Sequence, residues 1–148
     1  MEYSEQFKQR FIELTEDLDC KKSEIPKLLN IDYNVFTKIK EFGIIPKPLV
    51  LIRIADYFNI SIEYLLGRTK NSYFTKSETA VTFLERYQAL KAEKHLTDYA
   101  IAQSLHITTS YTTNWKNKNY IPSLVNLIVL SETFEVSLDY LLGRTDDR

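Results

Sequence analysis

The sequence has 148 residues, 44% of them hydrophobic and 26% charged, which is an ordinary balance for a globular protein. Its formal net charge of −1 argues against tight binding to nucleic acid, which depends on Lys and Arg contacts to phosphate. It holds no apolar run that could span a bilayer and no secretion-like start, so we expect a cytoplasmic protein. A single cysteine, Cys20, excludes an internal disulfide, and we expect no metal, cofactor or small-molecule ligand.

The chain has only three glycines and four prolines, which favours helices joined by short loops over sheets. Its first half reads as five helices. Ser23 is expected to cap the second helix, and Pro26 fits its first turn, where a helix needs no N–H partner. Gly67 is expected to end the fifth helix. The opening helix has an apolar stripe of Phe7, Phe11, Leu14 and Leu18. The later helices are predicted over residues 33–40, 48–58 and 62–66.

Residues 70–79, KNSYFTKSET, are mostly polar and are predicted to form a linker. After them the chain repeats itself. The segment SIEYLLGRT recurs as SLDYLLGRT with its glycine 76 residues later (143 − 67), and the same offset pairs apolar positions throughout without a gap. We therefore predict two domains, residues 1–69 and 80–148. The helices of the second copy are predicted over residues 81–94, 98–105, 109–118, 124–134 and 138–142.

The stretch from residue 96 to 122 predicts two short helices joined by a tight turn. Thr97 and Thr108 are expected to be the N-caps of the two helices, and His106 is placed in the turn. Asp98, Gln103 and Ser104 are expected to face water. The inward residues are predicted to be Ile101, Ala102, Leu105, Ile107, Thr112 and Trp115.

This pattern resembles the Cro and phage-repressor helix-turn-helix family, also called the XRE family. The resemblance covers residues 96–144 and rests on the helix 97–105, Ile107, Trp115, the corner IPSL at 121–124 and the closing SLDYLLGRT. It implies an all-α fold of two tandem five-helix, lambda-repressor-like domains. It also implies that the second helix of each pair can enter the major groove of DNA.

The resemblance places base contacts on the third helix of each copy. In the second copy the implied base-reading residues are Thr109, Ser110, Tyr111, Thr113 and Asn114. In the first copy they are Tyr33, Asn34, Thr37 and Lys38. The implied phosphate-binding residues are Lys116, Asn117, Lys118, Asn119, Tyr120 and Lys40.

The sequence departs from the family pattern at several positions. Asp98 stands where the family usually has a phosphate-binding Gln, and an acid there is expected to repel the DNA backbone. In compensation, no Asp or Glu occurs between Tyr99 and Ser131. In the first copy, the apolar residues Phe42 and Ile44 replace a polar rim, which leaves both DNA contact and protein contact open there.

We therefore predict a sequence-specific DNA-binding transcriptional regulator of the repressor type, from a bacterium, phage or mobile element. Double-stranded DNA is the expected partner, and one chain is expected to act as a pseudo-dimer or to form a homodimer. The alternative is an interaction protein, such as an antirepressor or a phage-encoded inhibitor, that keeps the fold and binds another protein. Acidic residues are scattered singly and no glycine-rich phosphate loop occurs, so we do not expect an enzyme.

Overall fold

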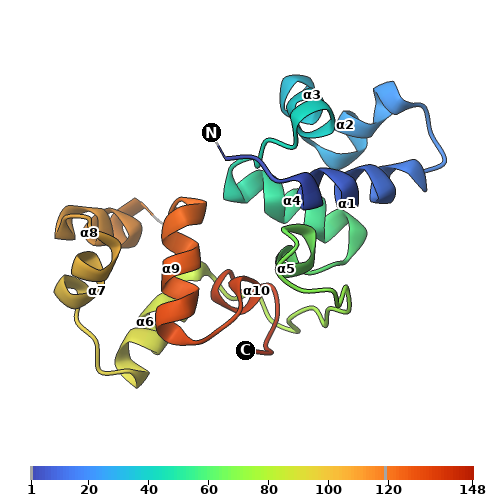
Figure 1. Ribbon diagram of the computed structural model, residues 1–148. Helices are drawn as coiled ribbons and strands as arrows, with labels where there is room; N and C mark the ends of the chain where they lie inside the picture. Colours follow the sequence, from blue (N-terminus) through green and yellow to red (C-terminus); the bar gives the residue numbers. More distant parts are fainter. Residues whose placement is uncertain (1, 119) are drawn as a thin grey trace. The chain divides into compact units, whose positions relative to one another are not determined.

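The computed structural model describes residues 2–118 and 120–148, apart from the side chains of Asn117 and Lys118. The chain divides into two compact units, Met1–Phe74 (unit 1) and Thr75–Arg148 (unit 2). In the described part of the chain every regular element is a helix, which confirms the all-α class (Figure 1). None of the described helices has the length and apolar character needed to cross a membrane.

Unit 1 packs its helices around a core that contains Phe7, Phe11, Ile39 and Ile54, each fully buried. The ring of Phe11 on α1 meets that of Phe36 on α3 edge-on, with the centroids 5.8 Å apart. The N-terminal segment closes over the end of α3, since the Ser4 amide donates to the Gly43 carbonyl at 2.9 Å. The elements are α1 (Glu5–Glu16), η1 (Lys22–Glu24), α2 (Ile25–Leu29), α3 (Tyr33–Phe42), α4 (Pro48–Phe58) and α5 (Ile62–Leu65).

In its described residues, unit 2 has five α-helices in the same order, with no counterpart of η1 between α6 and α7, and its core is built on aromatic rings. Tyr87 contacts Phe83, Trp115 and Phe134 at centroid distances of 5.8, 5.6 and 6.2 Å. The elements are α6 (Phe83–Glu93), α7 (Asp98–Leu105), α8 (Thr109–Lys118), α9 (Leu124–Phe134) and α10 (Leu138–Leu141). Three helices of unit 2, α8, α9 and α10, begin 76 residues after α3, α4 and α5 (109 − 33, 124 − 48, 138 − 62).

Both units fasten their first helix to their last with the same arginine contact. In unit 1 the Arg10 guanidinium lies over the Tyr64 ring, 4.1 Å from its centroid, and donates to the Thr69 carbonyl. In unit 2 Arg86 lies 3.9 Å from the centroid of Tyr140 and donates to the Thr145 carbonyl. A cation over an aromatic face is favourable, and here it also supplies partners to carbonyls that follow a helix end.

Most helix bounds agree with the sequence prediction, and α4, α7, α8 and α9 agree at both ends. The predicted capping role of Ser23 is wrong, because Ser23 lies within η1 and α2 begins after Glu24. Part of the predicted linker is fixed to unit 2, where the Ser77 amide donates to the Arg144 carbonyl at 2.9 Å. The domain boundaries at residues 69 and 80 stay predictions.

Candidate nucleic-acid interface

Helices α7 and α8 contact each other and are joined by a three-residue turn, as in a helix-turn-helix. Thr97 caps α7, as predicted, since its hydroxyl accepts the Ala100 amide at 3.1 Å. His106 ends the helix with φ 57°, in the left-handed region. The Ile107 amide then donates back to the Ala102 carbonyl at 3.0 Å, so the turn leaves α7 in a defined direction.

Two residues anchor α8 on its inner face. Trp115 and Thr112 are each 1% exposed, as the sequence predicted. The Trp115 indole meets Tyr87 and Phe83 edge-on, at centroid distances of 5.6 and 5.9 Å. The Thr112 hydroxyl donates to the Thr109 carbonyl at 2.7 Å, which satisfies its polar group inside the core. The rotation of α8 about its axis is therefore fixed.

The opposite face of α8 is polar and accessible. Tyr111 is 48% exposed, and its exposed neighbours Thr109, Ser110 and Thr113 offer hydroxyl groups. Asn114 is half-buried. The five residues predicted to read bases thus share one helix, and four of them are exposed. Threonine, serine and asparagine side chains can donate to and accept from base edges.

Asp98, the first residue of α7, is held by three side chains from two other helices. Its carboxylate accepts from the Tyr87 hydroxyl and the Lys91 ammonium, each at 2.8 Å, and it also pairs with Lys116 of α8. The side chain is 27% exposed. The expectation that Asp98 faces water is therefore wrong. Two lysines compensate its charge, which weakens the repulsion that we expected towards a phosphate backbone.

The pKa of Asp98 reflects this environment. Burial alone would raise it, but the hydrogen bonds from Lys116, Lys91 and Tyr87 outweigh burial and lower the pKa from 3.8 to about 2. Burial, followed by the hydrogen bond to Asp98, raises the pKa of the Tyr87 hydroxyl above its ordinary value. The carboxylate is therefore ionised at neutral pH, and it ties α6, α7 and α8 together.

Of the predicted phosphate-binding residues in unit 2, Lys116 and Tyr120 can be placed. Lys116 is half-buried on α8, where its ammonium pairs with Asp98, so a phosphate would share it with that carboxylate. Tyr120 is 42% exposed. Asn119 and the side chains of Asn117 and Lys118 lie outside the described residues.

The equivalent helix of unit 1 is α3, which carries all the base-reading residues predicted there. Tyr33 is 65% exposed, and Asn34 and Lys38 are also exposed. Thr37 is half-buried, and its hydroxyl donates to the Tyr33 carbonyl at 3.0 Å. Lys40, the predicted phosphate ligand, is half-buried and borders a pocket below α3.

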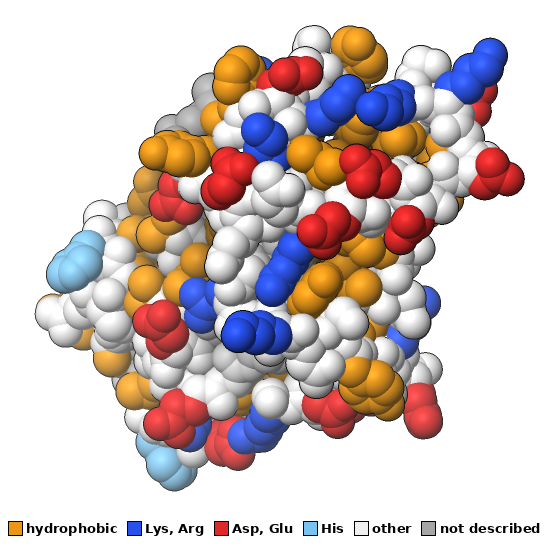
Figure 2. Space-filling view, turned by 45° about the vertical axis from the view of Figure 1, so that its right-hand side comes forward, with side chains coloured by type: hydrophobic (Ala, Val, Ile, Leu, Met, Phe, Trp, Pro, Cys, Tyr) orange, Lys and Arg blue, Asp and Glu red, His pale blue; other side chains and the backbone are white. Residues whose placement is uncertain are grey.

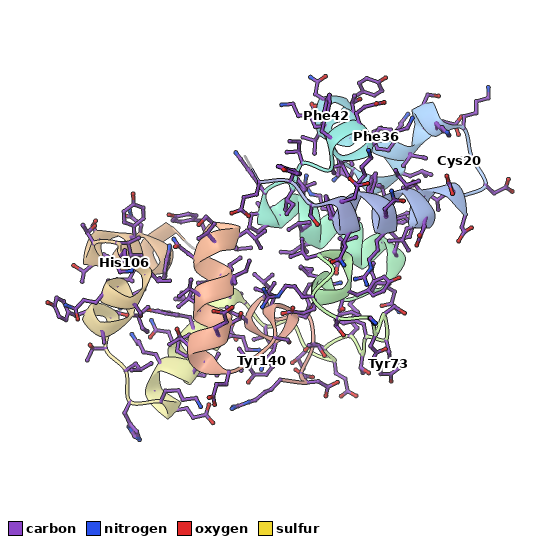
Figure 3. The ribbon with its side chains drawn as sticks, viewed as in Figure 1. Cys20, Phe36, Phe42, Tyr73, His106 and Tyr140 are labelled. Atoms are coloured by element: carbon purple, nitrogen blue, oxygen red, sulfur yellow. The ribbon has the colours of Figure 1, made fainter. Side chains whose placement is uncertain are left out.

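An apolar site lies at the C-terminal end of α3. Phe42 is 67% exposed there (Figure 3). Ile44 is half-buried, and its backbone pairs through an isolated antiparallel bridge with Tyr3, which is itself 76% exposed. Sequence reasoning missed Tyr3 as a neighbour of this site, since 41 residues separate it from Ile44 (44 − 3).

Charge is mixed over the face of the molecule drawn in Figure 2. Lys and Arg side chains alternate there with Asp and Glu side chains, without a large block of one sign on that face. The net charge of the chain is only −1, so its overall field does not attract a polyanion. Any such attraction must come from a local group of side chains, such as those of α8, which has no Asp or Glu.

An all-α fold with a helix pair such as α7 and α8 is typical of helix-turn-helix proteins. No protein-family model matches the chain, and no solved structure matches it. Over 65 residues, 44% of the chain, it is 31% identical to the uncharacterized HTH-type transcriptional regulator YobD of Bacillus subtilis (strain 168). The chain spans 58% of the length of that relative. The similarity supports a helix-turn-helix regulator family, while the XRE type and the two tandem copies stay predictions.

Proposed function

We propose that this protein is a sequence-specific DNA-binding transcriptional regulator of the repressor type. The proposal rests on the two faces of α8. Its inner face is anchored by the buried Trp115 and Thr112, and its outer face exposes four polar residues, none of them acidic. The name of the related YobD, an HTH-type transcriptional regulator, supports the same class. In this proposal α8 enters the major groove, and α7 lies across the DNA backbone.

The α8 side chains favour a site that contains A·T pairs. Asn114 can pair bidentately with adenine, and the ring of Tyr111 can contact a thymine methyl group. Lys116, Asn117, Lys118, Asn119 and Tyr120 are proposed to bind phosphates and to fix the register. Because few lysines are involved and one already pairs with Asp98, we expect a modest affinity per domain, raised by a second domain or by a homodimer.

Substitution of Asn114 tests this proposal. Asn114→Ala should weaken binding to the preferred duplex by about 1–3 kcal/mol and relax the preference at one base position, because a bidentate contact is lost. Competition binding against duplexes that carry each base at each position measures both effects. Thr133→Ala is the matched control, since Thr133 is exposed on α9, outside the proposed interface. Equal binding by the two variants would rule out base reading by Asn114.

A second candidate function is protein binding through unit 1. It rests on Phe42, an aromatic side chain 67% exposed at the end of α3, beside a segment where Tyr3 is also exposed. In this alternative the chain is an antirepressor-like interaction protein. Phe42→Ala would then abolish a protein complex and leave duplex binding unchanged, whereas Asn114→Ala would do the opposite.

A further inference from the structure

Unit 1 contains a pocket of about 140 Å³ lined by α1, the segment that follows it, η1, the start of α2, and α3. Its floor is apolar, with Ile25 at 4% and Phe36 at 6% exposed. Thr15 also lies at the floor, but its hydroxyl already donates to the Phe11 carbonyl at 2.9 Å. Ile12, Leu18 and Cys20 are half-buried on the walls. A cavity of about 150 Å³ accommodates a benzene ring, so the space suits one small apolar group.

The rim of the pocket is charged. Lys22 and Glu16 are exposed, and Lys40 is half-buried. Among the described residues, neither Lys22 nor Lys40 has a carboxylate within ion-pair distance. The three ionisable rim groups carry a net charge of +1. Two ammonium groups on the rim of one pocket attract an anion to it.

Comparison of the two copies of the repeat shows which group of unit 2 corresponds to such an anion. Shifted by 76 residues, Lys22 corresponds to Asp98 and Lys40 to Lys116, while Thr15 corresponds to Lys91. In unit 2 the Asp98 carboxylate pairs with Lys116 and lies 2.8 Å from the ammonium of Lys91. Unit 1 has a lysine in place of that aspartate and has the pocket at the same position. In unit 2 a carboxylate of the chain thus pairs with Lys116, whereas no described carboxylate, Glu16 included, pairs with Lys40 in unit 1.

We propose that the pocket of unit 1 binds a small carboxylic acid with one apolar group, whose carboxylate lies between Lys22 and Lys40. The apolar body of the ligand would rest on Ile25 and Phe36, and the carboxylate would take the place that Asp98 fills in unit 2. Cys20 lies on the segment between α1 and η1 and Phe36 lies on α3 (Figure 3). A ligand in the pocket would therefore touch both the loop and the helix.

Benzoate is a suitable probe, because its ring fits the volume and its carboxylate matches the lysines. We expect a Kd on the order of 1 mM for so small a ligand. A titration of the full chain, followed by amide NMR, should give saturable shifts at residues 15–25 and 36–40. Benzoate should also slow alkylation of Cys20, the one thiol of the chain, by iodoacetamide. Benzamide, which has the same ring without the charge, should bind at least about tenfold more weakly.

Three variants distinguish a specific binding site from a general attraction between benzoate and lysine side chains. Lys22→Gln should weaken benzoate binding about tenfold, because one charge-assisted hydrogen bond is lost. Glu16→Gln should strengthen it, since a nearby negative charge is removed. Lys22→Asp should abolish binding, because the new carboxylate can pair with Lys40 as Asp98 pairs with Lys116. The NMR spectra report in the same experiment whether each variant is folded.

The proposal fails if the shifts do not saturate, if they spread over exposed lysines of both units, or if Lys22→Asp binds benzoate as the parent chain does. One consequence rests on the proposed function. Lys40 is also a proposed phosphate ligand, so benzoate should weaken any DNA binding through unit 1. The NMR titration does not depend on DNA, so the failure of one proposal can be told from the failure of the other.

Discussion

Replacing Asp139 with asparagine is expected to destabilise unit 2 by about 3 kcal/mol. Asp139 and Arg144 form an ion pair whose side chains are 3% and 5% exposed. Neutralising Asp139 breaks a buried ion pair, and breaking such a pair from one side costs much more than the pair contributes by itself. Native-state hydrogen exchange, read by mass spectrometry on peptides of α6 and α10, measures the change in the free energy of unfolding.

The repeat provides a matched control for this variant. Glu63 and Arg68 occupy the same two positions in unit 1 and pair at 2.8 Å, but their side chains are 16% and 36% exposed. Glu63→Gln should therefore cost less than about 1 kcal/mol. Equal losses of protection in the two units would show that burial does not set the value of this ion pair.

Replacing Trp115 with alanine is expected to cost about 3–5 kcal/mol, the usual range for removing a large buried aromatic side chain. Trp115 is 1% exposed and holds α8 against Tyr87 and Phe83. The sequence of α8, TSYTTNWKNK, contains mostly residues of weak helix propensity, so the helix depends on this anchor. We expect α8 to lose its protection against hydrogen exchange, and DNA binding to be lost with it.

Tyr111→Ala on the same helix is the control for Trp115→Ala. Tyr111 is also aromatic, but it is 48% exposed, so its removal should change the free energy of unfolding by no more than about 0.5 kcal/mol. The two variants thus distinguish the anchored face of α8 from the exposed one. A Trp115→Ala protein with a fully protected α8 would contradict our account of how this helix is held.

The sequence predicted those features of unit 2 that depend on neighbouring residues. The bounds of α8 follow from Thr108 before it and the spacing of Thr112 and Trp115, and the structure confirms both the bounds and the buried anchors. Ser23 shows the limit of this reasoning. A serine before a proline-containing helix is an ordinary cap, yet the chain forms η1 through Ser23 instead.

Features that depend on distant residues were not predicted. Asp98 meets Lys91 and Lys116, which lie seven residues before it and eighteen residues after it on two other helices. No spacing rule within one helix brings those groups together. A comparison of the two copies offers a signal in hindsight, since Asp98 and Lys22 are opposite in charge at one position of the repeat. In unit 2 this position is the aspartate that pairs with Lys91 and Lys116, and in unit 1 it is a lysine on the rim of the pocket.

Sequence reading by this chain is tested most directly by selection of a random duplex library with the purified protein at about 50 and 200 mM salt. We expect enrichment of a motif that contains A·T pairs, with weaker binding at the higher salt. Two half-sites about 34 Å apart would indicate that two domains bind together. If a folded protein, with Trp115 buried, enriches no motif at either salt, the claim that this chain reads DNA sequence is contradicted.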